Sequence, residues 1–232
     1  MNIFITGANR GLGFALAKLA VERGYTVYAG ARDPLAAGQL QELQKENSAR
    51  IKPVALDVTS EESVAAAAQV LKEEGVSLHA IINNAAVLLG RSVPIEQLAL
   101  SDVTDSFAVN LFGPMLVAKH FLPLLVKDSK SSFINISSEA GSTAGAYGGD
   151  YPYALTKAAL NYFSLQIKRS LQAEGVQVYA VHPGWIQTDM GGAAAPGDPY
   201  AAAKGILDLM DRKVVPAHDQ VFVDHTGEAM PL

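Results

Sequence analysis

The chain has 232 residues, of which 49% are hydrophobic and 18% are charged, and it contains no cysteine. This length and composition are typical of a globular α/β protein, so we expect residues 1–232 to form a single domain. The formal charge of −5 argues against a nucleic-acid-binding surface, which needs clustered basic residues. The lack of cysteine excludes disulfides, thiol nucleophiles and thiolate metal sites.

The N-terminal run Met1–Gly7 has no basic region before its apolar residues and reaches glycine at once. It therefore predicts a first strand and not a signal peptide. We find no apolar run of the roughly 18 residues that a membrane span needs. The histidines show no spacing typical of metal ligands. These patterns predict a cytoplasmic protein with no metal site and with neither a membrane nor nucleic acid as a partner.

Short apolar runs alternate with helical patterns along the chain. We expect helices over Gly11–Arg23 and over Ser60–Glu74, the second with Ser60 as its N-cap. Apolar strands separated by helices predict a doubly wound parallel sheet of seven strands with helices on both faces. Pro53 removes a hydrogen-bond donor from the third strand and favours an edge position, which the strand order 3-2-1-4-5-6-7 provides. The predicted strands are Asn2–Thr6, Tyr25–Ala31, Ile51–Leu56, Leu78–Asn83, Ser132–Ser137, Val176–Val181 and Gln220–Val223.

A glycine-rich turn follows the first predicted strand and leads into a helix. A diphosphate needs backbone N–H donors at close range, and a helix N-terminus presents them with a favourable dipole. Gly7 permits a tight turn, Gly11 removes a side chain where a diphosphate would approach, and Gly13 lets the helix pack closely on the strand. Glycines in such a turn are often merely steric, but the preceding strand favours the phosphate interpretation. The turn reads Thr6-Gly7-Ala8-Asn9-Arg10-Gly11-Leu12-Gly13.

The end of the second predicted strand bears on the choice of dinucleotide. A cofactor without a 2′-phosphate usually meets an acid there, whereas this chain has Ala31 followed by Arg32. Arg32, together with Arg10 from the glycine turn, would favour the 2′-phosphate of NADP through charge-assisted hydrogen bonds. The alternative is two solvated arginines, with Asp33 forming a local ion pair with Arg32.

Tyr153 and Lys157 stand at i and i+4, on one face of a predicted helix. A nearby ammonium group would stabilise phenolate and lower the phenol pKa from its usual value of about 10. A tyrosine so tuned can protonate a carbonyl oxygen while hydride reaches the carbon. Ser137 and Ser138 close a predicted strand on opposite faces, so one of them is expected to bond the substrate oxygen. The alternatives are a half-buried tyrosine with a snorkelling lysine and a purely structural serine.

These motifs resemble the short-chain dehydrogenase/reductase family over nearly the whole chain. The resemblance implies a Rossmann-type nucleotide-binding fold and a catalytic set of Asn110, Ser138, Tyr153 and Lys157. Tyr153 would be the general acid, Lys157 would lower its pKa and bond the nicotinamide ribose, and Asn110 would hold a water that links Lys157 to solvent. The matching motifs are Thr6-Gly7-x-x-x-Gly11-x-Gly13, Asp57-Val58, Asn83-Asn84-Ala85, Asn110, Ser138, Tyr153-x-x-x-Lys157 and Pro183-Gly184.

The resemblance also implies which residues hold the cofactor, from the adenine pocket to the nicotinamide end. The chain departs from the family at Ala86, where glycine is usual, and in a longer loop, Glu139–Pro152, which is expected to form a wall of the substrate pocket. Asp57 and Val58 would meet the adenine. The full set of expected cofactor contacts is Gly7, Asn9, Arg10, Gly11, Leu12, Gly13, Arg32, Asp57, Val58, Asn84, Ala85, Tyr153, Lys157, Pro183, Gly184, Ile186 and Thr188.

A narrower resemblance, carried by His182–Gly192 and by the turn Asn9–Gly13, is to the sniffer-type carbonyl reductases and bacterial C-factor-like proteins. It implies NADPH-dependent reduction of carbonyl compounds. The loop Gly191–Pro199 is built of Gly, Ala and Pro and would cover the substrate, with apolar contacts from Tyr147, Trp185 and Met190. This composition predicts a permissive pocket for hydrophobic aldehydes, ketones or quinones, and the alternative is a loop shaped only for flexibility. Some members are discussed as intercellular signals, so the alternative is a cofactor-binding signalling protein with little turnover.

A third possibility is a nucleotide-sugar epimerase or dehydratase on a related fold. Those enzymes usually carry an added C-terminal substrate region, and few residues follow Thr188 here. The helices near Asn110 and Tyr153 are the usual assembly surface of the family, so the resemblance implies a homodimer or homotetramer.

Overall fold

Seven strands form one sheet in the computed structural model, which describes residues 1–232. They are β1 (Asn2–Thr6), β2 (Thr26–Ala31), β3 (Ile51–Ala55), β4 (Ala80–Asn83), β5 (Ser132–Ile136), β6 (Gln177–His182) and β7 (Phe222–Asp224). All neighbouring strands are parallel, in the order β3-β2-β1-β4-β5-β6-β7. The predicted fold class and strand order are therefore confirmed, with strand ends that differ by one or two residues.

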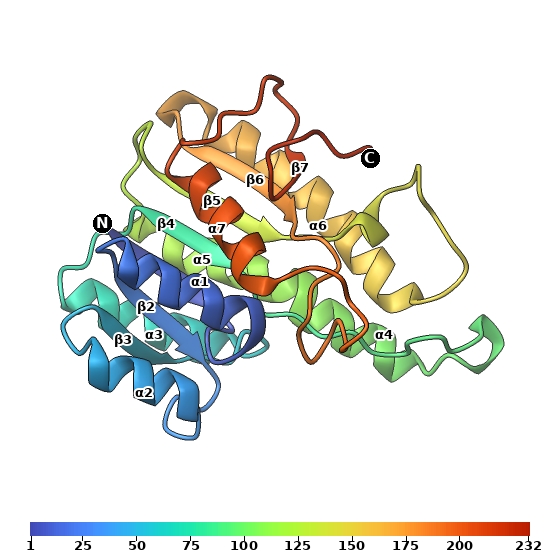
Figure 1. Cartoon of the computed structure of the whole chain (residues 1–232), viewed down its shortest axis with the longest axis horizontal. Coiled ribbons are helices and arrows are strands. Elements are labelled where there is room, and N and C mark those ends of the chain that lie inside the picture. Colours follow the sequence, from blue (N-terminus) through green and yellow to red (C-terminus); the bar gives the residue numbers. More distant parts are fainter.

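Helices cover both faces of this sheet (Figure 1). Helices α1, α2 and α7 pack on one face, and α3, α5 and α6 pack on the other. Strand β1 shows how alternation serves both layers, because Ile3 and Ile5 enter the first core while Phe4 enters the second and stacks on Phe121. The helices are α1 (Gly11–Glu22), α2 (Gly38–Glu46), α3 (Glu61–Glu73), α4 (Leu100–Phe107), α5 (Gly113–Phe121), α6 (Tyr151–Ser170) and α7 (Pro199–Met210).

Two local predictions are confirmed. Pro53 lies in β3, which is an edge strand and pairs only with β2. Ser60 caps α3, because its Oγ accepts the backbone N–H of Ser63 at 3.2 Å.

The resemblance implied a helix near Asn110, and the structure places that residue in a long helical stretch from Leu100 to Leu124 whose irregular centre was not predicted. A π-helical segment, Ala108–Phe112, joins α4 to α5, and by length and composition alone the whole stretch is able to cross a membrane. Polar residues interrupt its apolar ones, so no continuous apolar run marks it in the sequence. The stretch packs against α3 and α6, with Val117 and Phe121 fully buried, and one helix of this kind is weak evidence for a membrane.

Candidate active site

One cavity of about 1300 Å³ opens at the carboxyl ends of the strands. Every expected cofactor contact lines it, from the glycine turn and Arg32 to Thr188, and so do Ser138, Tyr153 and Lys157. Asn110 is the one expected site residue that does not line it. Ligands of open parallel sheets bind at this edge, so the fold itself favours a binding site here.

The glycine turn between β1 and α1 is shaped by close backbone contacts. Gly7 has φ of +65°, and a Cβ at that position would lie 2.9 Å from the Cα of Ala85. A Cβ on Gly13 would lie 2.1 Å from the carbonyl oxygen of Gly7, so only glycine allows α1 to start this close to β1. No side chain caps the N-terminus of α1, and its first N–H groups are therefore free to bind an anion.

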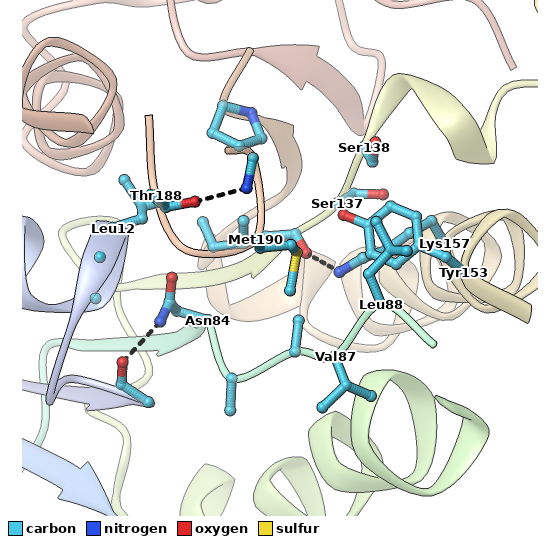
Figure 2. Close-up of a pocket in the computed structure, with 18 of the residues that line it drawn as sticks. Leu12, Asn84, Val87, Leu88, Ser137, Ser138, Tyr153, Lys157, Thr188 and Met190 are labelled. Atoms are coloured by element: carbon cyan, nitrogen blue, oxygen red, sulfur yellow. Dashed lines mark hydrogen bonds between the residues drawn. The ribbon is translucent and has the colours of Figure 1, made fainter. Parts of the chain in front are cut away.

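The two residues that directly follow β4, Asn84 and Ala85, hold this turn in place. The Oγ1 of Thr6 accepts the backbone N–H groups of Asn84 and Ala85, each at 3.0 Å. The Nδ2 of Asn84 donates to the carbonyl oxygens of Thr6 and Gly7, at 3.0 and 3.1 Å (Figure 2). Asn84 was expected as a cofactor contact, and the structure shows that its amide also fixes the turn that would hold the diphosphate.

The two arginines expected at the adenosine ribose differ in their partners. Arg10 forms an ion pair with Asp189, on the loop after β6. Arg32 has no carboxylate within ion-pair distance, because Asp33 instead accepts the backbone N–H groups of Leu35 and Ala36, at 3.0 Å each. The expected alternative of an Arg32–Asp33 pair is therefore wrong, and Arg32 is the arginine left free for a 2′-phosphate.

The structure separates the two serines that follow β5. The hydroxyl of Ser137 donates to the Oδ1 of Asn161 at 2.5 Å, in the protein interior, and so is occupied. Ser138 lines the cavity together with Tyr153, and its Oγ accepts the backbone N–H of Ala140 at 3.2 Å, which leaves the hydroxyl hydrogen free to donate. Ser138 is thus the serine placed to bond a substrate oxygen.

Tyr153 and Lys157 lie one turn apart on α6, with the Lys157 Nζ 5.4 Å from the centre of the Tyr153 ring. The Nζ donates to the carbonyl oxygen of Ile136 at 2.7 Å (Figure 2). Burial raises the pKa of Tyr153, against the opposing effects of Ser138 and the positive charge of Arg91. Burial also lowers the pKa of Lys157 to about 7.

Lys157 is not among the groups that shift the pKa of Tyr153 in this structure, so its expected lowering of that pKa stays a prediction. In this structure the ammonium group bonds a carbonyl at the end of β5, and desolvation is the largest effect on the phenol. The outcome still suits a general acid, because a phenol with a raised pKa keeps its proton at neutral pH. A lysine with a pKa of about 7 can then resupply that proton.

Asn110 lies in the π-helical segment and acts on the backbone around the site. Its Oδ1 accepts the N–H of Val87 at 2.8 Å, and its Nδ2 donates to the carbonyl of Val87 at 2.9 Å and to the Oγ1 of Thr156 at 3.1 Å. Thr156 in turn donates to the carbonyl of Tyr153 at 2.7 Å. Asn110 therefore fixes the loop after β4 to α6, and its role in holding a water stays a prediction.

Comparison with known proteins agrees with this geometry. Residues 1–199 match the family model described as short chain dehydrogenase. The chain belongs to the short-chain dehydrogenase/reductase family.

Individual relatives carry several activities in their names. The chain is 35% identical to estradiol 17-beta-dehydrogenase 2 of Rattus norvegicus over 99% of its own length, but it spans only 59% of that relative. Its structure is similar to carbonyl reductase Sniffer of D. melanogaster, with a TM-score of 0.92, 27% identity and coverage of 100% of this chain and 99% of that one. It is also similar to an NADPH-bound carbonyl reductase from chicken fatty liver, with a TM-score of 0.87, 29% identity and coverage of 100% and 98%.

Beneath the expected catalytic residues of this short-chain dehydrogenase/reductase lies a buried chain of polar side chains that was not predicted from the sequence. The Nδ2 of Asn83 donates to the Oδ1 of Asn135 at 2.8 Å, and the Nδ2 of Asn135 donates to the Oγ of Ser164 at 2.8 Å. These bonds join β4, β5 and α6, the three elements that carry or flank the site. Asparagine in otherwise apolar strands was the available signal, since a buried amide needs partners.

The cavity continues past the catalytic residues into a more apolar region. Met190 points into it from the loop after β6, opposite Leu88 (Figure 2). Tyr147 and Trp185 line it as expected. Met230 and Pro231 also line the cavity, which was not expected. The C-terminal residues fold back on β7, where the N–H of Met230 donates to the carbonyl of Phe222 at 3.0 Å.

Proposed function

We propose that this short-chain dehydrogenase/reductase reduces aldehydes, ketones or quinones to alcohols with NADPH. The observation that carries the proposal is the meeting of Ser138, Tyr153 and Lys157 on one cavity wall, in the same cavity as the glycine turn. A protein that only binds a dinucleotide needs no protonated phenol beside a lysine. The complete set therefore favours turnover over the signalling alternative.

The residues of the cavity fit a dinucleotide. Gly7 and Gly13 leave a cradle that side chains would fill, and α1 offers uncapped N–H groups to a diphosphate. NADPH supplies the hydride when it is bound. Arg32 supports NADPH over NADH because its guanidinium has no carboxylate partner and matches a phosphate in geometry.

The protein's own part in the reaction is proton delivery and orientation. Ser138 and Tyr153 would both bond the substrate oxygen, and the phenol Oη of Tyr153 would give its proton to that oxygen as negative charge develops. Lys157 would return a proton to the phenol. Asn110 and Thr156 would keep α6 and the loop after β4 in register.

The apolar region beyond Ser138 supports a hydrophobic substrate. Trp185 and Tyr147 are each about half exposed, at 54% and 52%, and so present ring surface that a ligand would cover. The similarity to estradiol 17-beta-dehydrogenase 2 adds steroid ketones to the compounds worth testing. We also propose a homodimer or homotetramer built on α4, α5 and α6, while the cytoplasmic location stays a prediction from the sequence.

The test is NADPH oxidation with aldehydes, aromatic ketones, quinones and steroid ketones, run beside NADH. Tyr153→Phe should abolish turnover and keep NADPH binding, because it removes the phenol hydroxyl that supplies the proton and keeps the ring. Tyr200→Phe, at an exposed tyrosine on α7 outside the cavity, is the matched control and should behave as the unaltered protein.

Tight NADPH binding with no turnover on any carbonyl would contradict the proposal and favour the signalling alternative. Equal rates in the unaltered protein and in Tyr153→Phe would contradict the assignment of the general acid.

A further inference from the structure

Arg91 lies on the loop between β4 and α4 and lines the substrate end of the cavity. Both of its neighbours have left-handed backbone, with φ of +64° at Gly90 and +58° at Ser92. The N–H of Ser92 donates to the Oδ1 of Asp150 at 3.2 Å, which ties this tight turn to the N-terminus of α6. The turn therefore holds Arg91 at the cavity wall.

The guanidinium of Arg91 is mostly unpartnered. Its one hydrogen bond runs from Nη2 to the carbonyl of Met190, at 2.9 Å, across the cavity. No carboxylate lies within 4.0 Å of it, whereas Arg10, the arginine of the glycine turn, is paired with Asp189. A guanidinium has five N–H donors, so Arg91 has donors to spare for a ligand.

Arg91 also lines the same cavity as Tyr153, where burial raises the pKa of the phenol and the positive charge of Arg91 partly opposes that effect. Two carboxylates face the same region. Asp150 is engaged by the N–H of Ser92 and by the hydroxyl of Tyr147, at 3.2 and 3.1 Å. Glu139 donates its backbone N–H to the Nδ1 of His182 at 3.2 Å, and it forms no ion pair with Arg91. Neither acid neutralises the guanidinium directly.

Apolar side chains line the same cavity, among them Leu88 on the loop of Arg91 and Met190 and Trp185 on the loop after β6. We propose that Arg91 is a specificity residue that selects carbonyl substrates in which an apolar body carries a carboxylate. A planar guanidinium fork matches a carboxylate in two parallel hydrogen bonds, while the apolar walls hold the body of the molecule. This inference rests on the proposed carbonyl reduction.

The test compares acids with their methyl esters, which have the same carbonyl and nearly the same shape. The pairs are para-formylbenzoate and a straight-chain oxo fatty acid, each with its ester. Arg91→Gln should lower the ratio of kcat/KM for acid over ester by tenfold or more, about 1.4 kcal/mol. Arg91→Lys should give an acid-to-ester ratio between those of the unaltered protein and Arg91→Gln, because lysine keeps the positive charge but cannot form two parallel hydrogen bonds to a carboxylate. Arg169→Gln, an exposed arginine at the far end of α6, should leave the ratio unchanged.

The change in kcat/KM for the ester measures any structural effect of losing the hydrogen bond from Arg91 to Met190. The acid-to-ester ratio of kcat/KM then isolates recognition of the carboxylate. An unchanged ratio, or equal losses for acid and ester, would overturn the role of Arg91 and leave carbonyl reduction standing. If the unaltered protein reduces no carbonyl, the proposed function fails. Calorimetric binding of para-formylbenzoate to the unaltered protein and to Arg91→Gln would then still decide whether Arg91 binds the carboxylate.

Discussion

Lys157 buries its amine at the end of β5, with the carbonyl of Ile136 as its acceptor. Burial lowers the pKa of Lys157 from 10.5 to about 7, so the folded chain loses this proton at a lower pH than the unfolded chain. Between those values the unfolded state binds more protons, and the stability of the folded state rises with pH. The charged form of the residue thus works against folding at neutral pH.

Lys157→Met should therefore stabilise the fold at pH 7, and its advantage should shrink as the pH rises. At about 1.36 kcal/mol per pKa unit, the difference in the free energy of unfolding between variant and unaltered protein should fall by about 2 kcal/mol from pH 7 to pH 9. Urea unfolding at both pH values measures it. Lys45→Met, at an exposed lysine, reports the general effect of losing a lysine. A difference that does not change with pH would show that the amine is not desolvated.

Arg32→Asp should move the cofactor preference from NADPH toward NADH. The substitution removes the free guanidinium and supplies an acid for ribose hydroxyls, so the ratio of kcat/KM for the two cofactors should fall at least tenfold, about 1.4 kcal/mol. Arg10→Gln should change this ratio less, because Arg10 is already paired with Asp189. Equal shifts in the two variants would assign the selectivity to both arginines, and no shift in Arg32→Asp would remove it from Arg32.

The identity of the acid–base residues could be predicted from local spacing, but their electrostatics could not. Tyr153 and Lys157 are four positions apart, a separation that a helix alone brings together. The pKa of Tyr153 instead depends on the packing around it and on Arg91, which comes from another loop. Asp189, the ion-pair partner of Arg10, is 179 positions away in the sequence, so no local sequence pattern predicts this pair.

At the scale of elements, the contact of α1 with β1 depends on one missing side chain. A Cβ on Gly13 would meet backbone, the carbonyl of Gly7, which cannot move aside without opening the turn. Gly38, the first residue of α2, has nothing within 4 Å of the same position. The two glycines differ only in how tightly they are packed, which makes them a matched pair.

Gly13→Ala should lower the free energy of unfolding by about 1–3 kcal/mol and weaken NADPH binding, because α1 must move away from the turn. Gly38→Ala should raise the free energy of unfolding by about 0.4–1 kcal/mol, since alanine reduces the freedom of the unfolded chain. Chemical denaturation and NADPH titration of both variants test this. Equal stabilities would mean that α1 adjusts without cost.

Strands and most helices follow from apolar patterns, as Ser60 at the start of α3 illustrates. The stretch from Leu100 to Leu124 does not, because its π-helical turn is set by tertiary contacts of Asn110 with Val87 and Thr156. Hydrogen bonds between one side chain and distant elements do not change the spacing of apolar residues in the sequence. Irregular helical turns near a functional site are therefore not predicted by that spacing.

For the whole molecule, α6, α5 and the π-helical segment before α5 present large apolar side chains to solvent. Phe112, Met115, Leu155 and Tyr162 are between 44% and 66% exposed. Side chains of this size gathered on two neighbouring helices favour an interface with a second copy.

The double substitution Phe112→Glu with Met115→Glu should therefore yield a monomer, as measured by light scattering, because charge is costly in an apolar interface. Val215→Glu, on the loop before β7 and 71% exposed, should leave the assembly intact. A monomeric unaltered protein would contradict the proposed oligomer.

The bonds from Asn84 and Ala85 to Thr6 link residues 78 and 79 positions apart. The glycine turn is thus completed only when β4 has taken its place beside β1. A chain that has folded no further than α3 has the glycines and the first helix but lacks the donors that fix them. Since distant pairings of this kind form slowly, the ability to bind a dinucleotide should arise late in folding. Dinucleotide binding during refolding would therefore report the pairing of β4 with β1, the step that joins the two halves of the sheet.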